Sequence, residues 1–377
     1  MKYAIPRTTA LMTAGLCIAA TTAVHASPEF EPRGRFHFDA AVHNEDKAEL
    51  DDGFLNRRAR MGVGGTIDDL WDFRIEYDFA EEGTSAADVR LRRSLPVGRL
   101  TIGQTKVPMG LNTLTSSNNM TFIERSSVSN IVTDSRRLGL HYGASSQNLL
   151  FQTSVYGRAI GDQEDGDMPL GVAGRMVLNP AMGENRMLHL GASLAYEDRR
   201  DYNDVRFRDR PEARPAGVRL IDTGGLGDVD STSKYGLEFA YQDGPFSIEA
   251  EYLSASVDRK DHSNPTFDGY HVQASYVLTG ESRGYGGGDF GGIRPQGAAG
   301  AWEIAARYSY VDLNDAGVQG GEQTNITLGL NYYANNNVRF MANAIFVDVK
   351  DSAAEVNGVP VGDDSPSIFL VRGQYSF

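Results

Sequence analysis

The chain has 377 residues, of which 50 are acidic and 36 are lysine or arginine, so its formal net charge is -14 at pH 7. This acidity argues against a nucleic-acid partner, because proteins that bind nucleic acids present basic surfaces to the phosphates. The single cysteine, Cys17, excludes a disulfide framework within the chain and a cysteine-based metal site.

The first 26 residues have the pattern of a secretory signal peptide. Lys2 and Arg7 precede an apolar run that is shorter than a bilayer requires, and the run ends in small residues that close on Ala26. We therefore predict that residues 1–26 are a cleaved leader and that residues 27–377 are the exported chain. Removal of the leader would bring the net charge to -16.

No later segment approaches the ~20 consecutive apolar residues of a membrane helix, so only a closed β-barrel could carry the chain across a bilayer. Segments in which apolar and polar residues alternate are the units of such barrels, because strand side chains point to opposite faces in turn. We find sixteen, an even number, as in bacterial barrels. They lie at residues 33–42, 55–66, 71–79, 89–92, 99–104, 137–142, 149–157, 171–178, 187–197, 235–242, 246–252, 270–279, 302–310, 326–332, 338–347 and 367–377.

Charged residues occupy the polar face of several segments. In residues 55–66 the alternation places Arg58 and Arg60 on the polar face and Arg57 on the apolar face near the rim. Carboxylates also project to the polar side, so a general or cation-leaning pore is an alternative to an anion pore. The acidic positions are Glu76, Asp78, Glu238, Glu249, Glu251 and Glu303.

The alternation stops between Lys106 and Ser135, and a structureless stretch of this length in a compact fold is usually functional. A barrel of sixteen strands is wide enough for an aqueous channel, which such a segment could narrow. Lys106, Ser116 and Ser117 are hydrogen-bonding residues suited to a constriction. We predict an all-β, 16-stranded antiparallel transmembrane β-barrel with an inward-folded constriction loop; the alternative for the segment is an extracellular loop.

The densest basic stretch of the chain is residues 199–219. Its arginines Arg206, Arg208 and Arg210 repeat every second residue, so an extended backbone would stack three guanidinium groups on one side at ~6.6 to 6.8 Å intervals. Guanidinium binds oxyanions through a planar fork, which predicts a ladder for anions. The alternative is that neighbouring carboxylates, such as Asp209, neutralise these arginines in weak surface pairs.

Two further loops have distinctive compositions. The acidic run Asp162–Asp167 lacks the spacing of a calcium loop, so we predict a solvated loop. The glycine-rich stretch Gly284–Gly292 does not follow the strand-to-helix pattern of a phosphate loop, and we predict a flexible loop. Nothing in either segment calls for a metal or another cofactor, and we predict none.

The chain ends in SIFLVRGQYSF. Phe369, Val371 and Tyr375 share one face of an extended strand, and Arg372 and Gln374 share the other. A strand that is apolar outward, polar inward and ends in an aromatic residue is typical of a transmembrane barrel. An edge strand of a soluble sandwich is the alternative.

Eight motifs, taken in order, resemble the phosphate-selective porins of the O and P type over essentially all of the mature chain. The resemblance implies a sixteen-stranded outer-membrane barrel that assembles as a homotrimer. It also implies a ladder of arginines that leads from the outer mouth to a constriction for phosphate or polyphosphate. The motifs are FLNRRARMGVGG, WDFRIEYDF, GQTKVPMGLNTLTSSNNMTFIER, RRLGLHY, VRFRDRPEARPAGVRLIDTG, YVLTGESRGY, GAWEIAARYS and NYYANNNVRFM.

The resemblance assigns roles to particular residues. It places the ladder on Arg206, Arg208, Arg210 and then Arg214, the paired arginines of the constriction on Arg57 and Arg58, and the inward loop on Lys106 to Arg125, with Ser116 and Ser117. Family members with strong phosphate preference bring lysines alongside these serines. Here Thr113, Asn118 and Asn119 occupy that neighbourhood, so the resemblance supports anion preference more than phosphate selectivity.

We predict passive diffusion of anions, phosphate or related oxyanions, through an arginine-lined pore in the outer membrane of a Gram-negative type of cell. The expected partners are small anions, outer-membrane lipid and further copies of the chain. The pore must bind an anion weakly enough to release it. An outer-membrane barrel enzyme or a secreted binding sandwich is the alternative from another class. Hydrolysis needs a nucleophile, a base and an orienting acid, and the histidines beyond the leader lie scattered without a recognisable serine motif, so we predict no enzymatic activity.

Overall fold

The computed structural model describes residues 28–377 except 81–82, 163–167, 181–184 and 200–203. The predicted leader therefore lies outside the described residues and stays a prediction. All of the acidic run except Asp162 also lies outside them.

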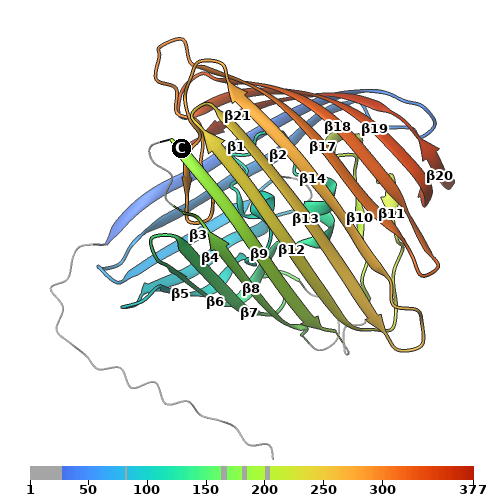
Figure 1. Cartoon of the computed structure of the whole chain (residues 1–377), viewed down its shortest axis with the longest axis horizontal. Helices are drawn as coiled ribbons and strands as arrows, with labels where there is room; N and C mark the ends of the chain where they lie inside the picture. The colour runs from blue at the N-terminus through green and yellow to red at the C-terminus, as the bar shows by residue number, and fades with distance from the viewer. Residues whose placement is uncertain (1–27, 81–82, 163–167, 181–184, 200–203) are drawn as a thin grey trace, which may run out of the picture.

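The described residues form a closed barrel, as the alternation predicted (Figure 1). Consecutive strands pair antiparallel, and the last strand pairs with the first from Arg35 opposite Ser376 to Asn44 opposite Ser367, which closes the wall. Within the described residues the wall has sixteen strands. They are β1 (Glu29–Asn44), β2 (Gly53–Thr66), β3 (Trp71–Asp78), β4 (Ser85–Ser94), β5 (Arg99–Lys106), β6 (Arg136–Ser145), β7 (Leu149–Tyr156), β8 (Leu170–Leu178), β9 (Arg186–Asp198), β12 (Val229–Asp243), β13 (Phe246–Arg259), β14 (Thr266–Val277), β17 (Ala301–Asp315), β18 (Val318–Tyr333), β19 (Val338–Val356) and β21 (Ser367–Ser376).

The two ends of the barrel differ. At one end, here called the turn end, most neighbouring strands are joined by short turns. The strand β1 begins at this end, and the chain finishes there after β21. At the other, the loop end, most connections are longer, and β20 (Val359–Asp364) pairs with the extended end of β19. No helix of the described residues is long and apolar enough to cross a membrane.

The wall is apolar outside and polar inside. In the closing strand Phe369 and Tyr375 are exposed on the outer surface, whereas Leu370, Arg372 and Gln374 are buried. In β3 the carboxylates of Glu76 and Asp78 are likewise buried inside. The burial of these residues confirms the predicted period-two pattern. The pattern arises because the outer face of such a barrel tolerates few polar groups.

One bulge changes the prediction for Arg57. The register between β1 and β2 shifts so that His37 lies opposite Arg58 while Phe38 lies opposite Asn56, which leaves Arg57 without an opposite residue. An extra residue in a strand bends it and re-aims its side chain. Arg57 therefore points into the barrel, as Arg58 does, and not outward as strict alternation predicts.

The segment between β5 and β6, here called the inner loop (residues 107–135), lies inside the ring of strands (Figure 1). It contains α1 (Leu111–Leu114) and α2 (Ser127–Val132), whose N-cap Ser126 accepts a hydrogen bond from the Ser129 amide. Far walls hold it: Asn343 of β19 accepts from the amide of Ile123 at 2.9 Å, and Arg372 of β21 donates to the Ile123 carbonyl at 2.6 Å.

The outer loop (residues 204–228) also descends into the loop end. It contains the short pair β10 (Arg208–Asp209) and β11 (Ile221–Asp222) and the 3-10 turn η1 (Arg214–Ala216). Its buried Leu220 and Ile221 join residues of the inner loop in one apolar cluster. The same cluster includes inward-facing residues of the longer wall strands. The two loops therefore occupy much of the loop half of the barrel interior and leave polar cavities there.

The connection between β14 and β17, here called the turn-end hairpin (residues 278–300), corrects the prediction of a flexible loop. β15 (Tyr285–Gly286) pairs with β16 (Asp289–Phe290) across Gly287 and Gly288, whose φ angles of 65° and 82° are those of a two-residue turn that favours glycine. The hairpin packs inside the barrel, where Phe290 contacts Leu111 of the inner loop.

We predict that Gly34 is needed for the C-terminal residue to dock. The backbones of Gly34 and Phe377 exchange two hydrogen bonds of 3.0 Å, and a Cβ at Gly34 would overlap the Phe377 ring. Gly34→Val should displace the ring, lower stability by about 1–3 kcal/mol and lower the temperature at which the folded band is lost on gels. Gly373→Val is the matched control, because a Cβ there meets nothing within 4 Å. Equal losses in both variants would contradict the prediction.

Candidate functional site

A polar cavity of about 380 Å³, here called the inner chamber, lies between the strands β1 to β8 and the inner loop. Two acidic residues, Asp88 and Asp289, line it, together with the serines Ser116 and Ser117. Ten basic residues line it: Arg35, Arg58, Arg60, Arg74, Arg90, Arg92, Lys106, Arg125, Arg136 and Arg175.

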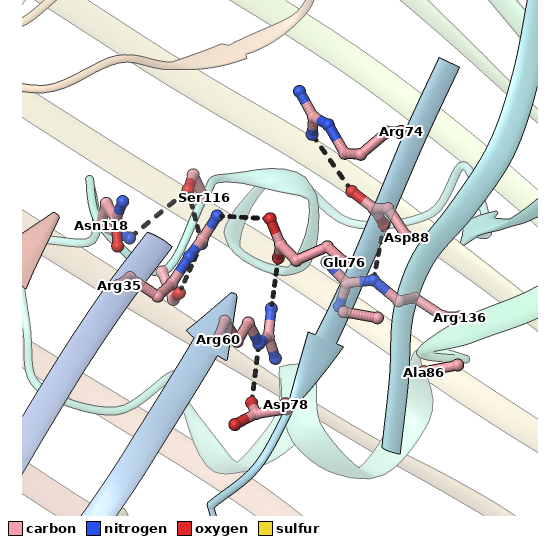
Figure 2. A network of polar contacts seen from close by, with 12 residues as sticks. Arg35, Arg60, Arg74, Glu76, Asp78, Ala86, Asp88, Ser116, Asn118 and Arg136 are labelled. Carbon is pink, nitrogen blue, oxygen red and sulfur yellow. Dashed lines mark hydrogen bonds and ion pairs between the residues drawn. The ribbon is translucent and has the colours of Figure 1, made fainter. Parts of the chain in front are cut away.

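Carboxylates of the same wall hold most of these arginines in place. Figure 2 shows the chain of contacts, in which Asp88 joins Arg74 and Arg136 while Glu76 lies between Arg35 and Arg60. Such pairs fix the direction of each fork before an anion arrives. The nitrogen–oxygen distances are 3.2 Å for Arg74–Asp88, 2.7 Å for Arg136–Asp88, 3.5 Å for Arg35–Glu76, 3.8 Å for Arg60–Glu76, 2.7 Å for Arg60–Asp78, 3.0 Å for Arg90–Asp72 and 2.7 Å for Arg92–Asp72.

Three cations of the inner chamber have no carboxylate partner among the described residues. Arg58 is only 4% exposed, and its Nε and Nη1 have no hydrogen-bond partner. Arg125 donates to backbone carbonyls, at 2.9 Å to Asn112 and 2.8 Å to Thr115, and Lys106 donates to the carbonyl of Thr113 at 2.6 Å. Burial lowers the pKa of Arg125 to about 10, so it stays charged at neutral pH. The chamber therefore keeps an excess of positive charge.

The two serines meet an arginine from another part of the chain. Arg35 Nη1 donates to Ser117 Oγ at 3.2 Å and lies 3.4 Å from Ser116 Oγ. Hydroxyl groups beside a guanidinium can donate to the oxygens of an anion that the guanidinium attracts. The structure thus brings Ser116, Ser117, Arg58, Arg60 and Lys106 to one chamber.

The other predicted arginines lie elsewhere. Arg57, Arg208, Arg210 and Arg214 line a second cavity of about 240 Å³ at the loop end, here called the outer cavity. Arg206 does not line it. Its guanidinium forms two hydrogen bonds of 2.6 Å with Asp222, and Arg208 Nη1 lies 3.9 Å from the same carboxylate. The partner Asp222 belongs to β11 and is not one of the carboxylates close to Arg206 in the sequence, and the ladder stays a prediction.

Glu124 and its partners separate the two cavities. Arg57 forms a forked pair with the Glu124 carboxylate at 2.6 and 3.2 Å, and Arg372 Nη2 adds a contact of 3.0 Å. Glu124 lines the outer cavity and its neighbour Arg125 lines the inner chamber, just as Arg57 and Arg58 divide between them.

A third cavity of about 570 Å³ adjoins the inner chamber at the turn end and is here called the turn-side cavity. Both spaces are lined by Arg90, Arg92, Thr105, Gln152 and Gly287. Basic residues therefore follow the interior from the loop end to the turn end.

Two inward carboxylates of β13 hold the inner loop. The Glu251 carboxylate accepts from the backbone amides of Leu111 and Asn112, the latter at 3.0 Å, and Glu249 accepts from the Asn112 side chain at 3.1 Å. With His271 these two residues form a group whose atoms are close enough to ligate a metal. Their oxygens already face N–H donors, however, so the donor set suits a loop anchor and does not suit a cation.

Several chamber residues were outside the set predicted for the pore. Arg74, Arg90 and Arg92 could be found from their inward positions by alternation, but nothing local marks them as part of a site. Arg35 and Arg136 lie at strand positions whose neighbours across the lumen become visible only in the folded barrel.

The chain is similar to proteins of one family along almost its whole length. Residues 30–377 match the family described as phosphate-selective porin O and P. Porin O of Pseudomonas aeruginosa is 29% identical over 366 residues, which cover 85% of this chain and 81% of that protein. An uncharacterized protein of Caulobacter vibrioides is 28% identical over 349 residues, with 87% and 70% covered.

Solved structures share the fold. OmpT of Vibrio cholerae, an outer membrane protein in its trimer form, superposes with a TM-score of 0.61 at 12% identity and covers 93% of this chain and 100% of its own. The anion-selective porin of Comamonas acidovorans superposes with a TM-score of 0.58 at 13% identity, again covering 93% and 100%. These likenesses support the barrel architecture alone.

Proposed function

The chain belongs to the phosphate-selective porin O and P family, and on this premise we propose that it is a passive channel that prefers anions and carries phosphate or related oxyanions. The observation that carries the proposal is the presence of three chamber cations, Arg58, Lys106 and Arg125, that have no carboxylate partner in the part of the chain that is described. A buried cation without a counter-charge favours an anion beside it.

In the proposed mechanism an anion first meets the arginines of the outer cavity, Arg208, Arg210 and Arg214. It then enters the inner chamber, where guanidinium forks replace part of its hydration and the hydroxyls of Ser116 and Ser117 donate to its oxygens. Arg90 and Arg92, shared with the turn-side cavity, offer the next position. Neighbouring sites of similar strength allow the anion to leave as readily as it arrives.

The proposal also covers membrane placement and assembly. The protein is an outer-membrane porin by family, and barrels of this kind have short periplasmic turns and longer extracellular loops, so the turn end would face the periplasm. We propose a homotrimer, which is supported by the trimer form of the similar Vibrio cholerae barrel. The strands β3 to β8 have 8 to 10 residues, whereas β17, β18 and β19 have 15 to 19. The side of the barrel that is formed by the shorter strands β3 to β8 would then face the other copies.

We propose no enzymatic activity and no cation preference. The inward carboxylates that the sequence predicts on the wall strands are engaged by arginines, by the inner loop or, for Glu303, by Asn331 at 2.8 Å and Tyr333 at 2.7 Å. Carboxylates held in this way compensate local charge and are poor attractors of mobile cations.

The direct test is the reversal potential of purified protein in a planar bilayer with a potassium chloride gradient. We expect a reversal potential close to the chloride limit, since the chamber is positive, and we expect added phosphate to reduce the chloride current in a concentration-dependent way. A potential of the opposite sign would favour the cation-leaning alternative. Protein unfolded by boiling serves as the control for contaminating channels.

A further inference from the structure

The turn-end hairpin brings a carboxylate into the inner chamber. Asp289 lines the chamber, where the charges of Lys106 and Arg175 act on it. Among the described residues its carboxylate has no hydrogen-bond or ion-pair partner. Asp88, the other acidic lining residue, bonds to two arginines. Asp289 is therefore the acidic residue of the chamber whose charge is not already matched.

Several contacts hold Asp289 at this point. Tyr285 Oη lies 2.6 Å from His189 Nδ1, and Arg175 donates to the Gly288 carbonyl at 2.8 Å. Arg283 ties the hairpin to the inner loop through the Asn119 carbonyl at 2.6 Å. Contacts with β9, β8 and the inner loop therefore fix the position of the hairpin and of its carboxylate.

The hairpin turn places this charge between two cavities of the interior. Gly287, two residues before Asp289, lines both the inner chamber and the turn-side cavity. The carboxylate therefore stands near the junction through which an anion would pass between these two spaces. A negative charge there raises the energy of an anion in the chamber, and the effect is greater for a divalent anion than for a monovalent one.

We propose that Asp289 is a specificity-determining residue of the pore: its unpaired carboxylate weakens the binding of oxyanions in the inner chamber and so promotes their release toward the turn end. The inference rests on the proposed function, because it requires that oxyanions occupy the chamber. It adds a repulsive element that opposes the three unmatched cations.

Acid should act in the same direction as removal of the charge. Burial raises the pKa of Asp289 to about 6, and the hairpin lies outside the wall strands. The carboxylate is neutral below this pH and charged above it, so anions should bind more tightly at about pH 5 than at about pH 8. The groups that interact electrostatically with it are Lys106 of β5, Arg175 of β8 and Tyr285 of the hairpin. The other charged groups that line the chamber are Arg35, Arg58, Arg60, Arg74, Asp88, Arg90, Arg92, Arg125 and Arg136.

Two more groups could change charge with pH. Burial raises the pKa of Asp209, in the outer cavity, to about 7, and His141 lines the turn-side cavity. The pH response of Asp289 is therefore read as the difference between the wild-type protein and a variant that lacks only this carboxylate.

The test measures block of the chloride current by sulfate, which keeps its two charges over this pH range, in planar bilayers. At about pH 8 Asp289→Asn should lower the half-blocking sulfate concentration by about threefold to tenfold, and Asp289→Glu should behave as the wild type. The wild type at about pH 5 should approach the variant. Asp69→Asn is the matched control, because Asp69 is an exposed carboxylate in the turn between β2 and β3 at the same end of the barrel.

The outcomes separate the two proposals. A wild-type pore that prefers anions and is blocked by sulfate, with Asp289→Asn unchanged in block and in pH response, would overturn the role of Asp289 and leave the channel function standing. A wild-type pore without anion preference would overturn the proposed function. Should Asp289→Asn not assemble, Asp289→Ser removes the same charge with a smaller side chain and is judged by the same measurement.

Discussion

Replacing Arg58 with glutamate is expected to abolish or reverse the anion preference of the pore. The Arg58 guanidinium is buried and has no carboxylate partner among the described residues, so its charge is not compensated locally. The substitution changes the charge of the chamber by two units where screening is weak. We expect the ratio of anion to cation permeability to fall by at least about tenfold, measured as the reversal potential in a salt gradient.

Two comparisons make this result interpretable. Arg58→Met removes the charge and keeps an unbranched side chain, so it should give an intermediate permeability ratio. Arg186→Glu is the matched control, because Arg186 lies at the turn end, is more than half exposed and pairs with Asp243 at 3.0 Å. It should leave selectivity unchanged. Wild-type selectivity in Arg58→Glu would remove Arg58 from the mechanism.

Replacing Glu251 with leucine is expected to widen the pore. The Glu251 carboxylate accepts from two consecutive amides at the start of α1, Leu111 and Asn112, and both amides are buried. Loss of this acceptor leaves two N–H groups unsatisfied, at about 1–3 kcal/mol each, so the inner loop should detach from β13. We expect single-channel conductance to rise by about twofold or more and current noise to increase, because a detached loop samples several positions.

The control for this effect is Glu303→Gln. Glu303 is also buried and inward. Its partners are Asn331 and Tyr333 of β18 and Arg339 of β19, the last at 3.7 Å, and none of them belongs to the inner loop. The glutamine oxygen can still accept from them, so conductance should stay near the wild-type value. An unchanged conductance in Glu251→Leu, with folding intact, would show that other contacts suffice to hold the loop.

The sequence alone predicted every strand of the barrel wall. Period-two patterning identified all sixteen strands and the faces of β3 and β21, because one side of each strand meets lipid and must be apolar. It also carried the break in pattern from Lys106 to Ser135, where the inner loop lies. These are local properties of short segments, and local properties can be read from neighbouring residues.

The tertiary structure decided which residues meet in the interior of the barrel. A one-residue bulge turned Arg57 inward, and Asp222 pairs with Arg206 and lies 3.9 Å from Arg208. The glycine-rich segment forms a hairpin, and contacts with the wall and the inner loop hold it inside the barrel. Arg35 meets Ser117 across 82 positions of the chain. Alternation tells a residue which side of the wall it faces, but the register of the strands and the path of the loops determine which residues it meets there.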